Sequence, residues 1–165
     1  MSKLFLMSGP CGAGKTTLAK QLSLERGLRY LGIEDFYAAF FGSELIHKHE
    51  EEVWEAFALA IRAAMLDEVD IIVDTNAPSR LDREWFFERF PDFEFNLICV
   101  HAPLEICVFN NKERARTIPE NELLSMYDAV ALPTEDEISK YASVSYYENI
   151  DNTGLKFIKS ITNRL

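Results

Sequence analysis

The sequence predicts an α/β protein with one domain, built on a five-stranded parallel sheet that helices cover on both faces. Short apolar runs alternate with longer segments of helical composition along the 165 residues, which is the pattern of strands joined by helical crossovers. Apolar residues make up 48% of the chain and charged residues 27%, the ordinary balance of a globular domain. Because no linker or low-complexity segment interrupts the pattern, we expect one domain over residues 1–165.

The first half of the chain is expected to hold three strands. The apolar run at 3–7 leads directly into glycines and is typical of a buried strand. Gly27 is the expected C-terminal stop of the helix that follows. A later helix repeats an apolar residue at every fourth position, which defines one face: Val53, Phe57, Ile61 and Met65. The expected order is strand 3–7, helix 15–27, strand 28–33, short helix 34–42, helix 48–68, strand 69–76 and helix 79–90.

The second half continues the alternation of strands and helices. Pro103 stands at the favoured first-turn position of a helix. The acidic segment 132–142 carries Thr134 as a candidate helix cap. The expected order is strand 93–102, a helix within 103–116, helix 118–130, the acidic segment, strand 143–149 and a last helix at 153–165.

The charge balance restricts the partners. The net charge is −10, from 27 acidic and 17 basic residues, which argues against a broad nucleic-acid surface because phosphate backbones favour clustered Lys and Arg. No signal peptide is expected, and no apolar run approaches the ~20 residues of a membrane span. The three cysteines show no metal-ligand spacing and fit a reducing cytosol. We therefore expect a cytoplasmic protein with no membrane partner.

The segment that follows the first strand predicts a phosphate-binding loop. Residues 9–16 fit the pattern G-x-x-x-x-G-K-[ST] at every fixed position, between a strand and a helix. Glycines let backbone N–H groups surround an anion, and the helix N-terminus adds unpaired donors. Lys15 supplies charge for the outer phosphates, and the Thr16 hydroxyl is a ligand for Mg²⁺. The predicted nucleotide-binding residues are Gly9, Cys11, Gly12, Ala13, Gly14, Lys15, Thr16 and Thr17.

A carboxylate follows the second strand, at the same sheet edge as the glycine loop. We interpret this residue, Asp35, as the base that takes the proton of an attacking hydroxyl group. The alternative is that Glu34 or Asp35 only caps a helix, and Glu34 is the weaker catalytic candidate. The aromatic side chains that follow are interpreted as core, although Tyr37 could line an acceptor site: Phe36, Tyr37, Phe40 and Phe41.

A polar triplet at 74–76 ends the third strand. Its first residue, Asp74, is typical of a carboxylate that holds Mg²⁺ beside a phosphate loop, together with Thr16. The alternative is an ordinary turn, which Asp and Asn also favour. Arg80 and Arg83 come next, and they form either a solvated face or a contact to the acceptor.

A basic segment near residue 114 predicts a lid. It carries Lys112, Arg114 and Arg116 in an otherwise acidic chain. Arginine matches phosphate oxygens with a fork of donors, and a mobile arginine can neutralise charge as the phosphoryl group leaves. We expect the lid at about 108–134, with Arg114 and Arg116 as its catalytic residues. The alternative is a solvated helix end that offsets the helix dipole.

Together these motifs resemble the AAA-type P-loop kinases that phosphorylate hydroxyl groups, especially the phage-type polynucleotide 5′-kinase domain, with zeta toxins and small-molecule kinases as relatives. The resemblance rests on "GPCGAGKTT", Asp35, "DTN" at 74–76 and the stretch at 110–127, and it covers about residues 3–130. It implies a P-loop NTPase fold with strand order 2-3-1-4-5. It also assigns Asp35 as the base, Lys15 to the phosphates, Thr16 to the metal and Arg114 to the transferring phosphate.

One departure from that family points to the acceptor. Polynucleotide kinases of this type carry an arginine three residues after the base, where this chain has Ala38. We therefore expect ATP/Mg²⁺-dependent transfer from a nucleoside triphosphate to a small hydroxyl-bearing acceptor such as a nucleoside, sugar or antibiotic. The alternatives are a kinase acting on a nucleic-acid 5′-hydroxyl and a nucleotide-binding regulatory module with slow hydrolysis.

Overall fold

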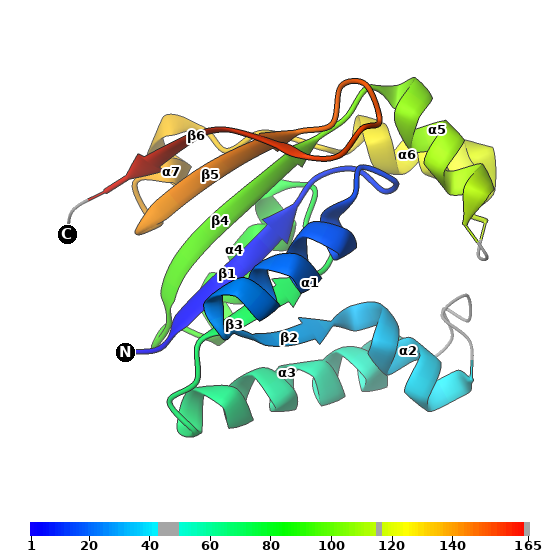
Figure 1. Cartoon of the computed structure of the whole chain (residues 1–165). Helices are drawn as coiled ribbons and strands as arrows, with labels where there is room; N and C mark the ends of the chain where they lie inside the picture. Colours follow the sequence, from blue (N-terminus) through cyan, green and yellow to red (C-terminus); the bar gives the residue numbers. More distant parts are fainter. Residues whose placement is uncertain (43–49, 115–116, 164–165) are drawn as a thin grey trace.

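The computed structural model describes residues 1–42, 50–114 and 117–163. Its sheet has six strands in the order β2-β3-β1-β4-β5-β6 (Figure 1). The first five strands are parallel and follow the order that the resemblance implied. The strands are β1 (Lys3–Ser8), β2 (Arg29–Gly32), β3 (Ile71–Asp74), β4 (Glu94–His101), β5 (Ser143–Glu148) and β6 (Lys156–Thr162).

Helices connect the parallel strands, as the alternating sequence pattern predicted. Gly27 and Gly42 end the first two helices in the left-handed conformation that glycine favours. Within the described residues the helices are α1 (Lys15–Arg26), α2 (Ile33–Phe41), α3 (Glu50–Leu66), α4 (Arg80–Arg89), α5 (Leu104–Glu113), α6 (Glu120–Asp128) and α7 (Glu135–Ile138). None of these helices is long and apolar enough to cross a bilayer.

Helices cover both faces of the sheet, which confirms the predicted layering. Successive side chains of a strand point to opposite faces. Leu6 of β1 belongs to a core that includes Phe57 of α3, whereas the next residue, Met7, belongs to a second core with Leu18 of α1. Leu6, Met7 and Phe57 are fully buried. The β1 strand therefore lies at the centre of the sheet with a packed core on each side.

The end of the chain corrects one prediction. The segment predicted as a helix at 153–165 contains β6, which pairs antiparallel with β5 at the sheet edge. Its apolar residues Phe157, Ile158 and Ile161 follow a helix-like spacing, but hydrogen bonds to β5 decide the structure. Because Phe157 and Ile158 are both about half exposed, the alternation typical of a half-buried strand is absent.

Candidate active site

The phosphate loop connects β1 to α1 at the carboxyl edge of the parallel strands. Gly12 has a φ of +82°, and a Cβ there would lie 2.6 Å from the carbonyl oxygen of Cys107 in α5. At Gly9, a Cβ would collide with the carbonyl oxygen of Val100 in β4. Only glycine fits these close approaches, so the loop lies tightly against two other elements.

The start of α1 is suited to an anion. Its N-cap residue is Gly14, no side chain from the described residues caps it, and no acidic residue occupies its first turn. The first backbone N–H groups of the helix are therefore left for a ligand, at the positive end of the helix dipole.

A cavity of about 510 Å³ lies over this loop. Six of the eight predicted nucleotide-binding residues line it: Cys11, Gly12, Gly14, Lys15, Thr16 and Thr17. Gly9 and Ala13 do not, because Gly9 abuts β4 and Ala13 is fully buried in the core with α1. Other lining residues come from four separate segments of the chain: Glu34; Asp74, Thr75 and Asn76; Asn110, Glu113 and Arg114; and Asn149, Asn152 and Gly154.

Lys15 is buried beneath the cavity. Its Nζ donates a hydrogen bond of 2.7 Å to the carbonyl oxygen of Pro10, within the loop itself. Burial lowers the pKa of its ammonium group, against the opposing effects of Cys11 and Asp74. An anionic ligand over the loop would offset this loss of solvation, because it places negative charge beside the ammonium.

Asp74 ends β3 and is buried in the same cavity. It accepts a hydrogen bond of 2.9 Å from the hydroxyl of Tyr30. Burial raises the pKa of Tyr30, and the charges of Asp74, Asp35 and Glu34 raise it further. The buried carboxylate of Asp74 therefore places negative charge at the wall of the phosphate cavity.

The donor set at this point fits Mg²⁺. Thr16 supplies a hydroxyl, Asp74 supplies a carboxylate, and both line the cavity over the loop. Magnesium is commonly held by one or two carboxylates together with substrate phosphates. The described residues contain no group of three or more His, Cys, Asp or Glu that could hold a metal, so phosphate oxygens and water would complete the coordination of a bound Mg²⁺.

The two carboxylates of α2 face different surroundings. Gly32 is the N-cap residue of this helix, so the alternative that Glu34 or Asp35 caps it is wrong. Asp35 is exposed and lines neither this cavity nor its larger neighbour, whereas Glu34 is half-buried and lines both. The charge of Asp35 still reaches Tyr30.

A second cavity of about 930 Å³ adjoins the first. The two share Ile33, Glu34, Thr75 and Asn76. Tyr37 lines the larger cavity, as the sequence left open, and is at the same time buried in the core. Phe36 packs edge-on against Phe57 at 5.2 Å between ring centroids, which confirms its core role, whereas Phe40 is 52% exposed and its interpretation as core is wrong.

The arginine predicted for the lid reaches the phosphate loop. Arg114 follows the last turn of α5, lines the smaller cavity and donates a hydrogen bond of 3.4 Å to the sulfur of Cys11. In the same helix, the Asn110 side chain donates to the carbonyl oxygen of Gly12 at 2.9 Å. Arg116 lies outside the described residues, and Lys112 is exposed and does not line the cavity.

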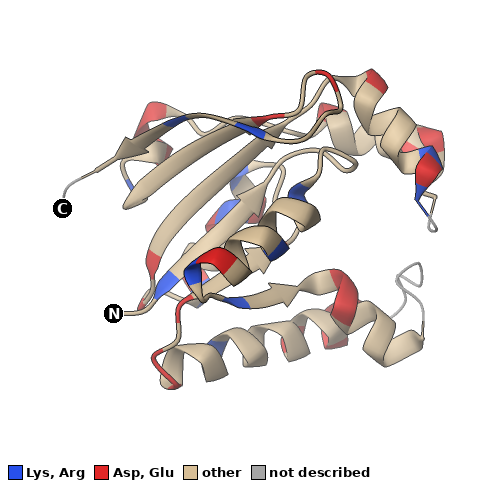
Figure 2. Cartoon of the chain, in the orientation of Figure 1, with Lys and Arg blue, Asp and Glu red and all other residues tan. Residues whose placement is uncertain are grey.

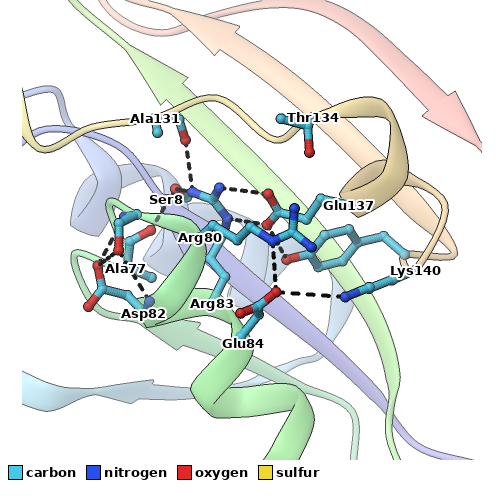
Figure 3. A network of polar contacts seen from close by, with 12 residues as sticks. Ser8, Ala77, Arg80, Asp82, Arg83, Glu84, Ala131, Thr134, Glu137 and Lys140 are labelled. Carbon is cyan, nitrogen blue, oxygen red and sulfur yellow. Dashed lines mark hydrogen bonds and ion pairs between the residues drawn. The ribbon is translucent and has the colours of Figure 1, made fainter.

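The arginines of α4 are structural rather than free to contact an acceptor. Arg83 is fully buried and forms a bidentate ion pair with Glu137 of α7 (Figure 3). Its Nε lies 2.6 Å from Glu137 Oε1 and its Nη2 lies 2.9 Å from Glu137 Oε2. Burial alone would lower the pKa of Arg83, but the hydrogen bonds and charge of Glu137 raise it. Arg80 pairs with Glu84 at 2.7 Å and with Asp136 at 2.9 Å. The interpretation of Arg83 as an acceptor contact is therefore wrong.

Several residues of the site carry no motif. Tyr30 is a strand residue whose hydroxyl reaches Asp74 only because β2 and β3 are neighbours. Asn110 lies within an ordinary helical segment. The Asn149 side chain is buried at the rim of the first cavity, and its Oδ1 has no hydrogen-bond partner among the described residues. Since these positions depend on the packing of distant segments, no local pattern could have identified them.

The sequence of this chain matches a known protein family. The sequence pattern of the AAA domain family matches residues 4–133, which include the phosphate loop, Asp74 and Arg114. The chain belongs to this AAA domain family. No curated protein matches the chain significantly.

Solved structures share the fold of this AAA domain. A sugar kinase from Janibacter sp. HTCC2649 is 19% identical with a TM-score of 0.66, and the match covers 93% of this chain and 88% of that one. A chain of the Pnkp1/Rnl/Hen1 RNA repair complex is 17% identical with a TM-score of 0.71, over 78% of this chain and 44% of that one. A chain of the AvrRxo1-ORF1:-ORF2 complex with ATP is 15% identical with a TM-score of 0.75, over 98% and 59%. The last two are considerably longer than this chain.

Proposed function

We propose that this AAA domain is an ATP/Mg²⁺-dependent phosphotransferase that moves the γ-phosphate to a hydroxyl group of a small molecule. The observation that carries the proposal is the pair of adjoining cavities, one over the phosphate loop and one beside it. A nucleoside triphosphate in the first and an alcohol in the second would meet at the wall that they share. A sugar kinase shares the fold, which supports the proposed type of reaction.

The proposed transfer needs few protein groups. The acceptor oxygen forms a bond to the γ-phosphorus, the bond from that phosphorus to the bridging oxygen breaks, and ADP leaves with the electron pair. The hydroxyl proton passes to a carboxylate of the protein. Lys15 and Arg114 neutralise charge on the phosphate oxygens. Thr16 and Asp74 would hold Mg²⁺, which when bound neutralises charge on the triphosphate.

The proton acceptor lies at the start of α2. The family resemblance assigns the role to Asp35, but Glu34 is the residue that lines both cavities, and we propose Glu34 on this ground. The variants Glu34→Gln and Asp35→Asn separate the two assignments. Glu34→Gln should reduce turnover by about 10²-fold or more with ATP affinity kept, while Asp35→Asn should stay within a few-fold of the parent. The reverse ranking would return the role to Asp35.

The proposal is tested by an acceptor screen with γ-labelled ATP. Nucleosides, sugars, amino alcohols and antibiotics form one arm, and a 5′-hydroxyl oligonucleotide forms the other, because one structural neighbour belongs to an RNA repair complex. Lys15→Ala is the blank. We expect transfer to a small alcohol and weak labelling of the oligonucleotide, since the Lys and Arg positions of the described residues are distributed along many helices and strands (Figure 2). Salt-sensitive labelling of the 5′ end that exceeds every small alcohol would favour the polynucleotide kinase instead.

The regulatory alternative makes a different prediction in the same assay. A nucleotide-binding module would release labelled phosphate slowly and label no acceptor. The state of the cysteines supports the proposed compartment, because Cys11, Cys99 and Cys107 are all free thiols. Free thiols agree with the reducing cytosol proposed for this protein.

A further inference from the structure

The carboxylate of Asp74 is held by a tyrosine from the neighbouring strand. The hydroxyl of Tyr30 donates to Asp74 Oδ2 at 2.9 Å, and no other group of the described residues donates a hydrogen bond to this carboxylate. Burial and the charge of Asp74 raise the pKa of Tyr30, so the hydroxyl stays protonated and remains a donor at neutral pH. Asp74 lines the phosphate cavity, whereas Tyr30 does not. The tyrosine therefore contacts the carboxylate from outside the cavity.

The sheet register brings the tyrosine to this carboxylate. The strands β2 and β3 are parallel neighbours, with Tyr30 opposite Ile72 and Gly32 opposite Asp74. Side chains two residues apart in a strand share a face, so the Tyr30 side chain passes over Gly32 on its way to Asp74. A Cβ on Gly32 would collide with the Tyr30 hydroxyl oxygen and would lie 2.9 Å from its Cζ. The hydrogen bond to Asp74 therefore depends on the absence of a side chain at residue 32.

The backbone of Gly32 does not itself require glycine. Its φ of −105° and ψ of 126° are extended values that any residue adopts. It is also the N-cap residue of α2, a position where Ser, Asp or Asn would satisfy a free N–H of the first turn. The close approach of Tyr30 is thus the reason that the structure gives for glycine at this position.

The ring of Tyr30 also contacts the helix that follows the phosphate loop. Lys20 of α1 places its Nζ 5.3 Å from the centroid of the ring. Thr16, the other proposed magnesium ligand, lies four residues before Lys20 and so on the same side of α1. Tyr30 therefore packs between β3 and α1, the two elements that carry Asp74 and Thr16.

From these contacts we infer that Tyr30 is a positioning residue for Asp74 as a ligand of Mg²⁺. The inference rests on the magnesium site of the proposed function and adds a residue to it. The hydroxyl of Tyr30 occupies Asp74 Oδ2 and fixes the carboxylate before a metal binds, so that Oδ1 is left for the metal or for a water bound to it. Removing such a partner behind a metal ligand typically lowers metal affinity by about 10–100-fold.

Calorimetry of ATP binding, with Mg²⁺ and with EDTA, measures this role without any transfer. Tyr30→Phe removes the hydroxyl and keeps the ring. We expect the variant to bind ATP in EDTA within about twofold of the parent, and the gain in affinity that Mg²⁺ provides to fall by about tenfold. An unchanged gain would overturn the inference. An equal loss of affinity with and without Mg²⁺ would also overturn it, because the hydrogen bond would then only support the fold.

Two further variants locate the effect. Tyr127→Phe removes a comparable hydroxyl, which donates to the carbonyl oxygen of Ala102 at 3.0 Å, and Tyr127 lines neither cavity. This variant should keep both ATP affinities of the parent. Gly32→Ala should reproduce the result of Tyr30→Phe, since its Cβ displaces the hydroxyl at the mobile end of the tyrosine side chain. A normal gain from Mg²⁺ in Gly32→Ala, or an equal loss of that gain in Tyr127→Phe, would overturn the inference.

Asp74→Asn in the same assay separates this inference from the proposed function. As a variant of a metal ligand it should lose the gain from Mg²⁺. If Asp74→Asn loses the gain and Tyr30→Phe keeps it, the inference is overturned and the magnesium site of the proposed function stands. If Tyr30→Phe loses the gain but labelled phosphate reaches no acceptor in the screen, the inference stands and the proposed phosphotransferase is overturned.

Discussion

Breaking the ion pair between Arg83 and Glu137 from one side should strongly destabilise the protein, and Glu137→Gln tests this. The substitution keeps the shape of the side chain and removes its charge. Arg83 is left fully buried, with its remaining hydrogen bonds to Ser8 Oγ at 3.3 Å and to the carbonyl oxygens of Pro78 and Ala131 at 3.1 and 2.9 Å. Those acceptors are neutral, so the guanidinium charge has no ionic partner in the network of Figure 3.

The magnitude follows from burial. Removing one partner of a buried ion pair costs about 3–5 kcal/mol, because the other charge stays in a medium of low polarity. For a chain of this length, 1 kcal/mol shifts Tm by about 2–4 °C, so the expected fall in Tm is about 6–20 °C. Urea unfolding followed by circular dichroism gives the free energy directly.

Two further variants make the reasoning refutable. Asp67→Asn breaks an exposed pair with Arg29, 3.3 Å long and with side chains 42% and 60% exposed, and should cost less than about 1 kcal/mol. Combining Arg83→Met with Glu137→Leu removes both charges and should recover a large part of the loss. If Glu137→Gln costs no more than Asp67→Asn, the ion pair contributes little and this account of the network is wrong.

Three other outcomes are expected. Lys15→Ala should reduce transfer by about 10²–10³-fold, and activity within threefold of the parent would contradict the proposed mechanism. Arg114→Ala should lower kcat more than it weakens ATP binding in calorimetry, because its charge acts mainly on the transferring phosphate; unchanged turnover would assign the role to Arg116 or to no arginine of the segment. Gly12→Ala should destabilise the protein and weaken nucleotide binding, since its Cβ would meet the Cys107 carbonyl oxygen at 2.6 Å; a normal melting curve with normal ATP affinity would show that the loop is looser than described.

The parts of the fold that local chemistry determines were predictable from the sequence. The alternation of apolar runs with helical segments predicted the five parallel strands, and the phosphate loop was identified because it needs glycine at fixed positions next to a lysine. Gly27 and Gly42 end helices in the left-handed conformation, a preference that belongs to glycine itself. In each case the residues that determine the local structure lie within or next to the element that they form.

The parts that depend on distant contacts were not predictable. The β6 strand has a helix-like spacing of apolar residues and becomes a strand because β5 offers it an edge. Nothing near Arg83 in the sequence indicates that it meets Glu137, which is 54 residues away. The choice between Glu34 and Asp35 has the same origin, because the direction in which α2 leaves the sheet decides which carboxylate reaches the cavities.

The central position of β1 has a consequence for how the chain is made. Leu4 pairs with Ile71 on one side and with Phe95 on the other, and Gly9 abuts Val100. The strand that carries the phosphate loop is therefore synthesised before either of its neighbours. At about 5–20 residues per second, several seconds pass before β4 is available. Before β3 is made the apolar residues of β1 have no neighbouring strand, and a nascent chain that stops before residue 100 has the phosphate-loop sequence but lacks the β4 backbone against which Gly9 packs.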